Sequence, residues 1–163
     1  MVNSPTFTLS EASLQFAKNI NSQVWELLQQ PQRTRVEDEL LVHAAHASCY
    51  HWLRNGSELH HQRAEWLLAH VYTVLKMPSL ALKYAARCNE LTQEFMSLMR
   101  DFDRAYAFEA LARANALAGN RVEALKYIDL AEKASHEIQD KEDLKIFSED
   151  FKGGDWFGLR SAE

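Results

Sequence analysis

The tetrapeptide Ala-Leu-Lys-Tyr occurs twice in the chain, at Ala81–Tyr84 and at Ala124–Tyr127, 43 residues apart. The same shift aligns further pairs: Leu68-Ala69 with Leu111-Ala112, and Lys76-Met77 with Gly119-Asn120. Because the agreement extends to both sides of a predicted turn, it indicates a repeated structural unit. Each unit is predicted to be a helix, a tight turn and a second helix. Such a unit cannot bury its apolar face alone and has to stack on its neighbours.

Helix signals along the chain predict an all-α fold. Only 5 glycines and 3 prolines occur among 163 residues, which favours long helices over many short strands. Ser10 is a candidate N-cap for the first helix, and Asn55-Gly56 ends the second. The prediction is one helical domain over residues 1–139, with helix pairs at about 9–54, 57–99 and 101–139. Residues 140–163 are expected to form an amphipathic and aromatic tail that packs on this domain.

Composition excludes several functional classes. The net charge is −5 and basic residues alternate with acidic ones, so no phosphate-binding face is expected and nucleic acid is not a predicted partner. The first residues lack the pattern of an export signal, and the most apolar run, Trp66–Leu75, is too short for a bilayer. Cys49 and Cys88 lie among apolar helical neighbours and are expected to be reduced core thiols. The sequence thus predicts a cytoplasmic protein that does not bind a membrane.

The second repeat unit, Tyr106–Ala134, resembles a tetratricopeptide (TPR) repeat. The matching positions are the large aromatic Phe108, the Leu111-Ala112 pair, the turn Gly119-Asn120, and the small residues Ala124 and Ala131. The first unit matches at Leu68, Ala69, Tyr72 and Ala81, but Lys76 replaces the turn glycine and Glu65 the aromatic residue. The period of 43 residues is longer than the family's usual period of about 34. The chain is therefore similar to longer-period TPR-like arrays. That implies a right-handed stack of about three helix pairs, the first of them degenerate, with a C-terminal cap.

The resemblance also implies a binding groove, because the first helix of each TPR pair lines a concave surface that holds partner segments. The implied groove residues are Arg63, Trp66 and His70, followed 43 residues later by Tyr106, Glu109 and Arg113. Arginine binds carboxylates bidentately, so an acidic segment or a C-terminal carboxylate is the expected ligand. An alternative is that the two aromatic residues simply pack between adjacent helices. The predicted function is a non-catalytic protein- or peptide-binding module that needs no cofactor.

A histidine-rich stretch suggests a different class of function. Six of the 7 histidines lie between His43 and His70, and imidazole is a good ligand for zinc or iron. A metal-dependent helical enzyme would use His43, His46 and His70. However, the chain has no HExxH motif and only one ExxH, at Glu58–His61, whereas di-iron bundles use two. A solvated polar stripe is the competing interpretation.

The C-terminal tail carries aromatic residues that need cover. Leu144, Phe147 and Phe151 recur at helical spacing, and Trp156-Phe157 follows two glycines. Exposed together, these side chains would form an adhesive apolar patch. They are expected to cap the last helix pair, to enter a groove, or to form a homodimer contact. The last case is a third functional hypothesis, a structural protein that self-associates through Trp156 and Phe157.

Overall fold

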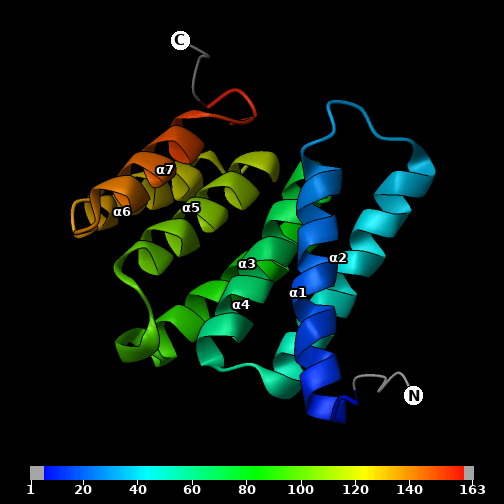
Figure 1. The fold of residues 1–163 in the computed structure, drawn as a ribbon. Coiled ribbons are helices and arrows are strands. Elements are labelled where there is room, and N and C mark those ends of the chain that lie inside the picture. Colours follow the sequence, from blue (N-terminus) through cyan, green and yellow to red (C-terminus); the bar gives the residue numbers. More distant parts are fainter. Residues whose placement is uncertain (1–5, 160–163) are drawn as a thin grey trace.

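The structure, a computed structural model, describes residues 6–159. Within this range the chain forms seven α-helices, one 3₁₀ turn and no strand, which confirms the all-α prediction. The helices are α1 (Leu9–Leu28), α2 (Arg35–Asn55), α3 (Glu58–Val74), α4 (Pro78–Glu94), α5 (Asp101–Leu117), α6 (Arg121–Ser135) and α7 (Lys141–Lys152), with the 3₁₀ turn η1 (Met96–Leu98) between α4 and α5. Consecutive helices pack as the adjacent pairs α1/α2, α3/α4 and α5/α6 (Figure 1).

The 43-residue period is present in the structure. Helix α5 begins and ends 43 residues after α3, and the starts of α2, α4 and α6 follow one another at the same interval. The turns inside the second and third pairs have the same geometry: Lys76 and Gly119 are both left-handed, with φ of 57° and 79°. In both turns the next amide, of Met77 or Asn120, donates to a helix carbonyl at 2.9 Å. Glycine adopts this conformation without strain, and lysine adopts it here in the equivalent place. The architecture is compatible with a helical repeat.

Several helix boundaries differ from the predicted ones. The N-cap of α1 is Thr8, which forms a reciprocal capping box with Glu11, while Ser10 lies inside the helix and donates to Asn55 at 2.9 Å. The predicted fourth helix is shorter, because α4 gives way to the 3₁₀ turn η1. The amphipathic start of the tail forms a separate helix, α7, capped by Asp140. Seven described helices therefore replace the six predicted ones.

Helix α5 is the centre of the molecule. It packs against α3, α4, α6 and α7, and it is buried on nearly every side. Its fully or almost fully buried alanines are Ala105, Ala107, Ala110, Ala112, Ala114 and Ala116. Such short side chains allow neighbouring helices to approach closely.

The predicted burial of Cys49 and Cys88 as free thiols is confirmed, and burial raises the pKa of Cys49 to about 12.

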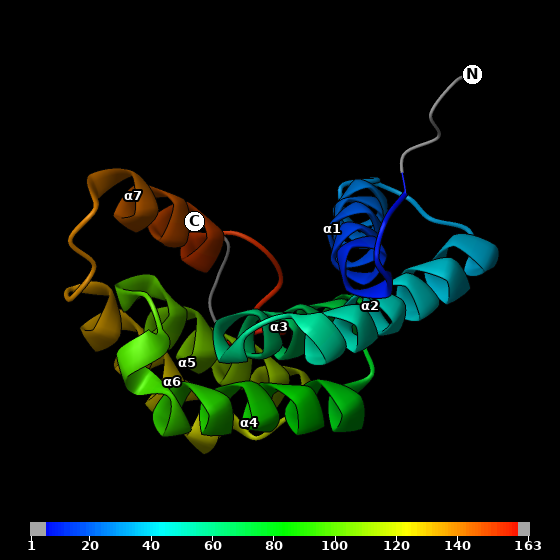
Figure 2. The same ribbon diagram turned by 60° about the horizontal axis from the view of Figure 1, so that its bottom comes forward.

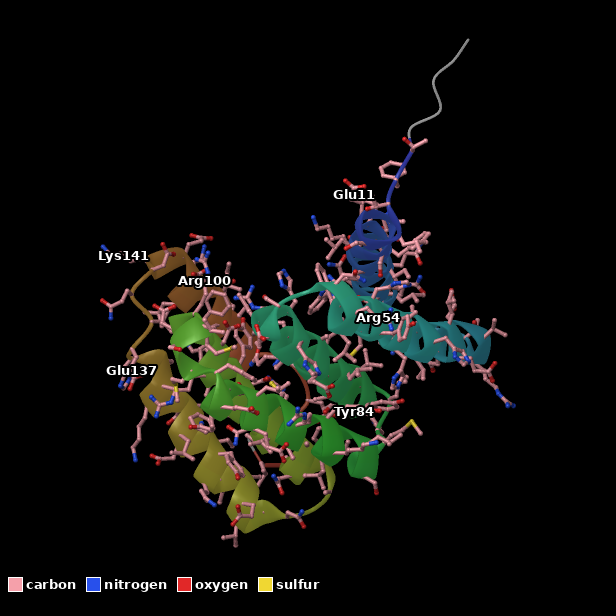
Figure 3. All side chains as sticks on the ribbon, turned by 90° about the horizontal axis from the view of Figure 1, so that it is seen from below. Glu11, Arg54, Tyr84, Arg100, Glu137 and Lys141 are labelled. Carbon is pink, nitrogen blue, oxygen red and sulfur yellow. The ribbon has the colours of Figure 1, made fainter. Side chains whose placement is uncertain are left out.

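The arrangement leaves one side of α3 and α5 flanked by two separate helices. Figure 2 shows α1 and α7 standing on the same side of α3 and α5, apart from each other. The link that carries the chain from α6 to α7 runs between Glu137 and Lys141 (Figure 3), and Arg104 of α5 binds Glu137 at 2.9 Å. Among the described helices, none is both long and apolar enough to cross a membrane.

Candidate binding groove

Two adjoining cavities, of about 470 and 420 Å³, open on the side of α3 that faces α1 and α7. They share four lining residues, Trp25, Trp66, Tyr106 and Asp150. These four come from α1, α3, α5 and α7 respectively. The two cavities therefore form one continuous groove along α3, called the α3 groove below.

All six residues predicted for the groove line it. Arg63 lines the first cavity, His70, Glu109 and Arg113 line the second, and Trp66 and Tyr106 line both. That these residues bind a partner stays a prediction. Sequence reasoning missed other lining residues: Asn21 and Trp25 of α1, Trp52 of α2, His60 of α3, Phe102 and Asp103 of α5, and Glu149 and Asp150 of α7.

A connected row of aromatic rings forms the floor of the groove. The ring of Trp66 stacks on His70 at 5.3 Å between centroids, lies 6.1 Å from Trp25, and meets Tyr106 edge-on at 5.4 Å. Phe102 also meets Tyr106 edge-on, at 6.3 Å between centroids. Offset and edge-to-face pairs of this kind hold aromatic side chains rigidly. The rings thus pack between helices and line the cavities at the same time. Packing between adjacent helices and a place on the groove are therefore compatible for Trp66 and Tyr106.

Arg63 is committed to a carboxylate of its own chain. Its Nε and Nη2 donate to the two carboxylate oxygens of Asp103, at 2.8 and 3.1 Å. The Asp103 side chain is only 4% exposed, so it depends on this bidentate pairing for compensation of its charge. The same guanidinium lies 5.0 Å from the ring centroid of Phe102.

Arg113 makes more contacts within the chain than Arg63 does, with Glu109, α7 and the tail. The guanidinium is buried, donates from Nε to Glu109, and lies 4.2 Å from the ring centroid of Trp156. Its other donors bind backbone carbonyls of α7 and the tail: Asp150 at 2.8 Å, Gly153 at 2.9 Å and Asp155 at 3.1 Å. Burial raises the pKa of Glu109, and the Arg113 charge opposes that rise. The sequence placed Arg113 on the groove correctly, but its guanidinium meets main-chain carbonyls of this chain.

The tail forms one end wall of the groove. Phe147, Phe151 and Trp156 are all buried, and the Trp156 indole donates to the Phe151 carbonyl at 3.2 Å. Phe157 is half-buried and lines the second cavity. Trp156 is 4% exposed within the single chain, so its burial does not depend on a second subunit.

The three histidines of the metal alternative do not converge. His46 is hydrogen-bonded to the Tyr72 hydroxyl at 2.7 Å and contacts Tyr84 of α4, whereas His70 stacks on Trp66 in the groove. Two other histidines pack apart from these: His60 stacks on Trp52 at 4.4 Å, where both line the first cavity, and His51 is hydrogen-bonded to Ser13. In the described part of the chain, no group of three or more His, Cys, Asp or Glu side chains is placed to hold a metal ion. The metal alternative, which needs His43, His46 and His70 at one site, is therefore not supported by this arrangement: histidines that are close in sequence lie on different surfaces.

The environment of His70 predicts a loss of stability in acid. Burial lowers the His70 pKa from 6.5 to about 4, with a further contribution from Arg113, while Asp150 opposes the shift. Above pH 6.5 the ring is neutral in both states. Between pH 6.5 and 4 the unfolded chain binds a proton that the folded chain does not, so the free energy of unfolding falls, by up to about 3 kcal/mol.

A His70→Gln variant isolates this effect. Urea unfolding at pH 7 and at pH 4.5 should show a larger acid-induced loss in the wild type than in the variant. The other histidines and the carboxylates titrate in both proteins and cancel in the comparison. Parallel losses in the two proteins would contradict the assignment.

Comparison with known proteins gave no relative. Neither a family model, nor a curated protein, nor a solved structure significantly matches this chain. The function is therefore inferred from the geometry of the groove.

Proposed function

We propose that this chain is a non-catalytic, TPR-like binding module whose α3 groove holds a peptide segment of a partner protein. The observation that carries the proposal is the pair of adjoining cavities with a shared aromatic floor. Clefts of a few hundred Å³, mostly apolar with a few polar groups, are the usual form of a binding site. Here the four residues that line both cavities come from four helices that lie far apart in sequence: three aromatic residues from α1, α3 and α5, and Asp150 from α7.

The TPR-like description rests on two features. The helix pairs keep a common period, with equivalent left-handed turns at Lys76 and Gly119. The groove is lined mainly by α3 and α5, the first helices of the second and third pairs, as the resemblance implies, and α1 adds Asn21 and Trp25.

A peptide suits the groove better than a compact small molecule. Its lining extends along α3 from His60 to Val74, which at 1.5 Å per helical residue is roughly 21 Å, and continues to Lys76 in the following turn. An extended peptide of about six residues covers the helical part of that distance. Trp66 lies near the middle and contributes to both cavities, so it is the expected central anchor.

Peptide binding should depend on the aromatic floor. We expect peptides selected from a random-sequence display library against the immobilised protein to bind at least about tenfold more weakly to Trp66→Ala, because aromatic anchors dominate such interfaces. Fluorescence anisotropy with the labelled selected peptides measures the affinity. Trp25→Ala, which changes a partly exposed ring of α1 in both cavities, should weaken the same peptides.

The matched control is Tyr50→Ala, an aromatic residue that is 57% exposed on α2 and lines neither cavity. It should bind the selected peptides like the wild type. Circular dichroism and urea unfolding establish that each variant is folded at the assay temperature. If folded Trp66→Ala and Trp25→Ala proteins both kept wild-type affinity, the α3 groove would not be the binding site.

A further inference from the structure

We propose that the α3 groove recognises a basic peptide segment, whose arginine or lysine side chain is seated in the first cavity against Trp66 and Tyr106, with its charge at Asp150. This inference rests on the proposed function and names its ligand class. It reverses the acidic ligand expected from the sequence. The reason is that both arginines of the groove are already paired within the chain.

The charge balance of the groove favours a cation. Among the described residues, its two cavities are lined by three cationic side chains and five carboxylates. Arg63 is paired with Asp103, and Arg113 with Glu109. In the first cavity, the pairing of Arg63 leaves the exposed Asp150 as the uncompensated charge. An acidic peptide would be repelled by Asp150 there, and the Arg63 Nε and Nη2 donors are already taken by the buried Asp103.

The position of Asp150 suits a cationic ligand. Its Oδ2 accepts a hydrogen bond from the Tyr106 hydroxyl at 2.6 Å, which orients the carboxylate at the junction of the two cavities. Asp150 also lies in the last turn of α7, where the partial negative charge of the helix end favours cations. Tyr106 and Trp66 line both cavities together with Asp150, so they place aromatic rings beside this charge, and aromatic rings attract a nearby cation.

The chain itself binds guanidinium groups in this way at two places along the groove. Arg63 combines the ring of Phe102 with the carboxylate of Asp103. Arg113 combines the ring of Trp156 with a carboxylate and with carbonyls at the end of α7. The centre of the groove presents the same combination, the Trp66 and Tyr106 rings and the Asp150 carboxylate. Among the described residues, Arg113 binds the backbone carbonyl of Asp150, and no arginine forms a salt bridge with its carboxylate.

Three pools of short synthetic peptides test the ligand class. The pools share their apolar positions and differ only in one residue type, which is arginine, glutamine or glutamate. Binding of each labelled pool to the full chain is measured by fluorescence anisotropy. We expect the arginine pool to bind most tightly and the glutamate pool least tightly, with added salt weakening the arginine pool.

The Asp150→Asn variant tests the proposed charge partner. An amide oxygen can still accept from Tyr106, so the change removes the charge and keeps the hydrogen bond. We expect about fivefold weaker binding of the arginine pool, as for loss of one partly exposed ion pair, and no loss for the glutamine pool. The control is Asp129→Asn, which removes the same charge from the exposed face of α6, outside both cavities.

The outcomes separate this inference from the proposed function. Preference for the arginine pool that is lost in Asp150→Asn and kept in Asp129→Asn supports the basic ligand. Groove-dependent binding with a preference for glutamate or glutamine, or equal effects of the two charge variants, overturns the basic ligand and leaves the peptide-binding function. If neither the pools nor the selected peptides bind in a way that depends on Trp66, the peptide-binding function itself is overturned.

Discussion

Replacing Arg113 by methionine is expected to lower the free energy of unfolding by about 3–5 kcal/mol. The substitution leaves the Glu109 carboxylate buried without its cationic partner, and it removes the donor for three backbone carbonyls of α7 and the tail. Methionine retains much of the apolar stem, so the loss reports the charge and its hydrogen bonds. Urea unfolding followed by circular dichroism at pH 7 measures the difference.

A double variant distinguishes an uncompensated charge from general damage. When both charges are removed together, in Glu109→Gln/Arg113→Met, the buried carboxylate is gone and the double variant should be more stable than Arg113→Met alone. The tail carbonyls still lack their donor, so stability should remain below that of the wild type. A double variant that is no more stable than the single one would show that the tail contacts, and not the buried pair with Glu109, carry the effect.

Arg113 also shows which features of the site could be predicted from the sequence and which could not. The repeat register placed Arg113 beside His70 on the groove, because position in a repeated helix follows from the sequence period alone. The period does not predict which other segment of the chain packs over a given side chain. The aromatic residues of the tail predicted that it packs back on the domain, but the tail has no counterpart in the repeat. The capture of Arg113 by its carbonyls could therefore not be predicted from the spacing.

The same distinction explains the other missed contacts. Arg63 and Asp103 are 40 residues apart, on two helices whose packing in space creates the bidentate pair. Trp25 lies on α1, whose link to α2 is longer than the corresponding link in the later pairs, so no repeat register identified it as a groove residue. Because these pairings set the charge of the groove, its aromatic character could be predicted from the sequence while its charge balance could not.

Phe147→Ala is expected to lower the free energy of unfolding by about 3–5 kcal/mol, since it removes a large side chain that is only 1% exposed and leaves a cavity. The neighbouring Ile146 is 45% exposed, and Ile146→Ala should cost much less. Comparison of the two by urea unfolding separates burial from a change of helix propensity in α7.

The change should also reach the groove. Phe147 meets Tyr106 edge-on at 4.9 Å and stacks on Phe151 at 5.3 Å, so it fixes α7 on α5. The hydrogen bond between Tyr106 and Asp150 joins the same two helices at the proposed cation site. Under conditions where Phe147→Ala remains folded, we therefore expect it to bind the arginine pool more weakly than Ile146→Ala does. Equal affinities of folded Phe147→Ala and Ile146→Ala for the arginine pool would mean that the packing of α7 on α5 does not determine the position of Asp150. The Asp150 charge would then act only by long-range attraction.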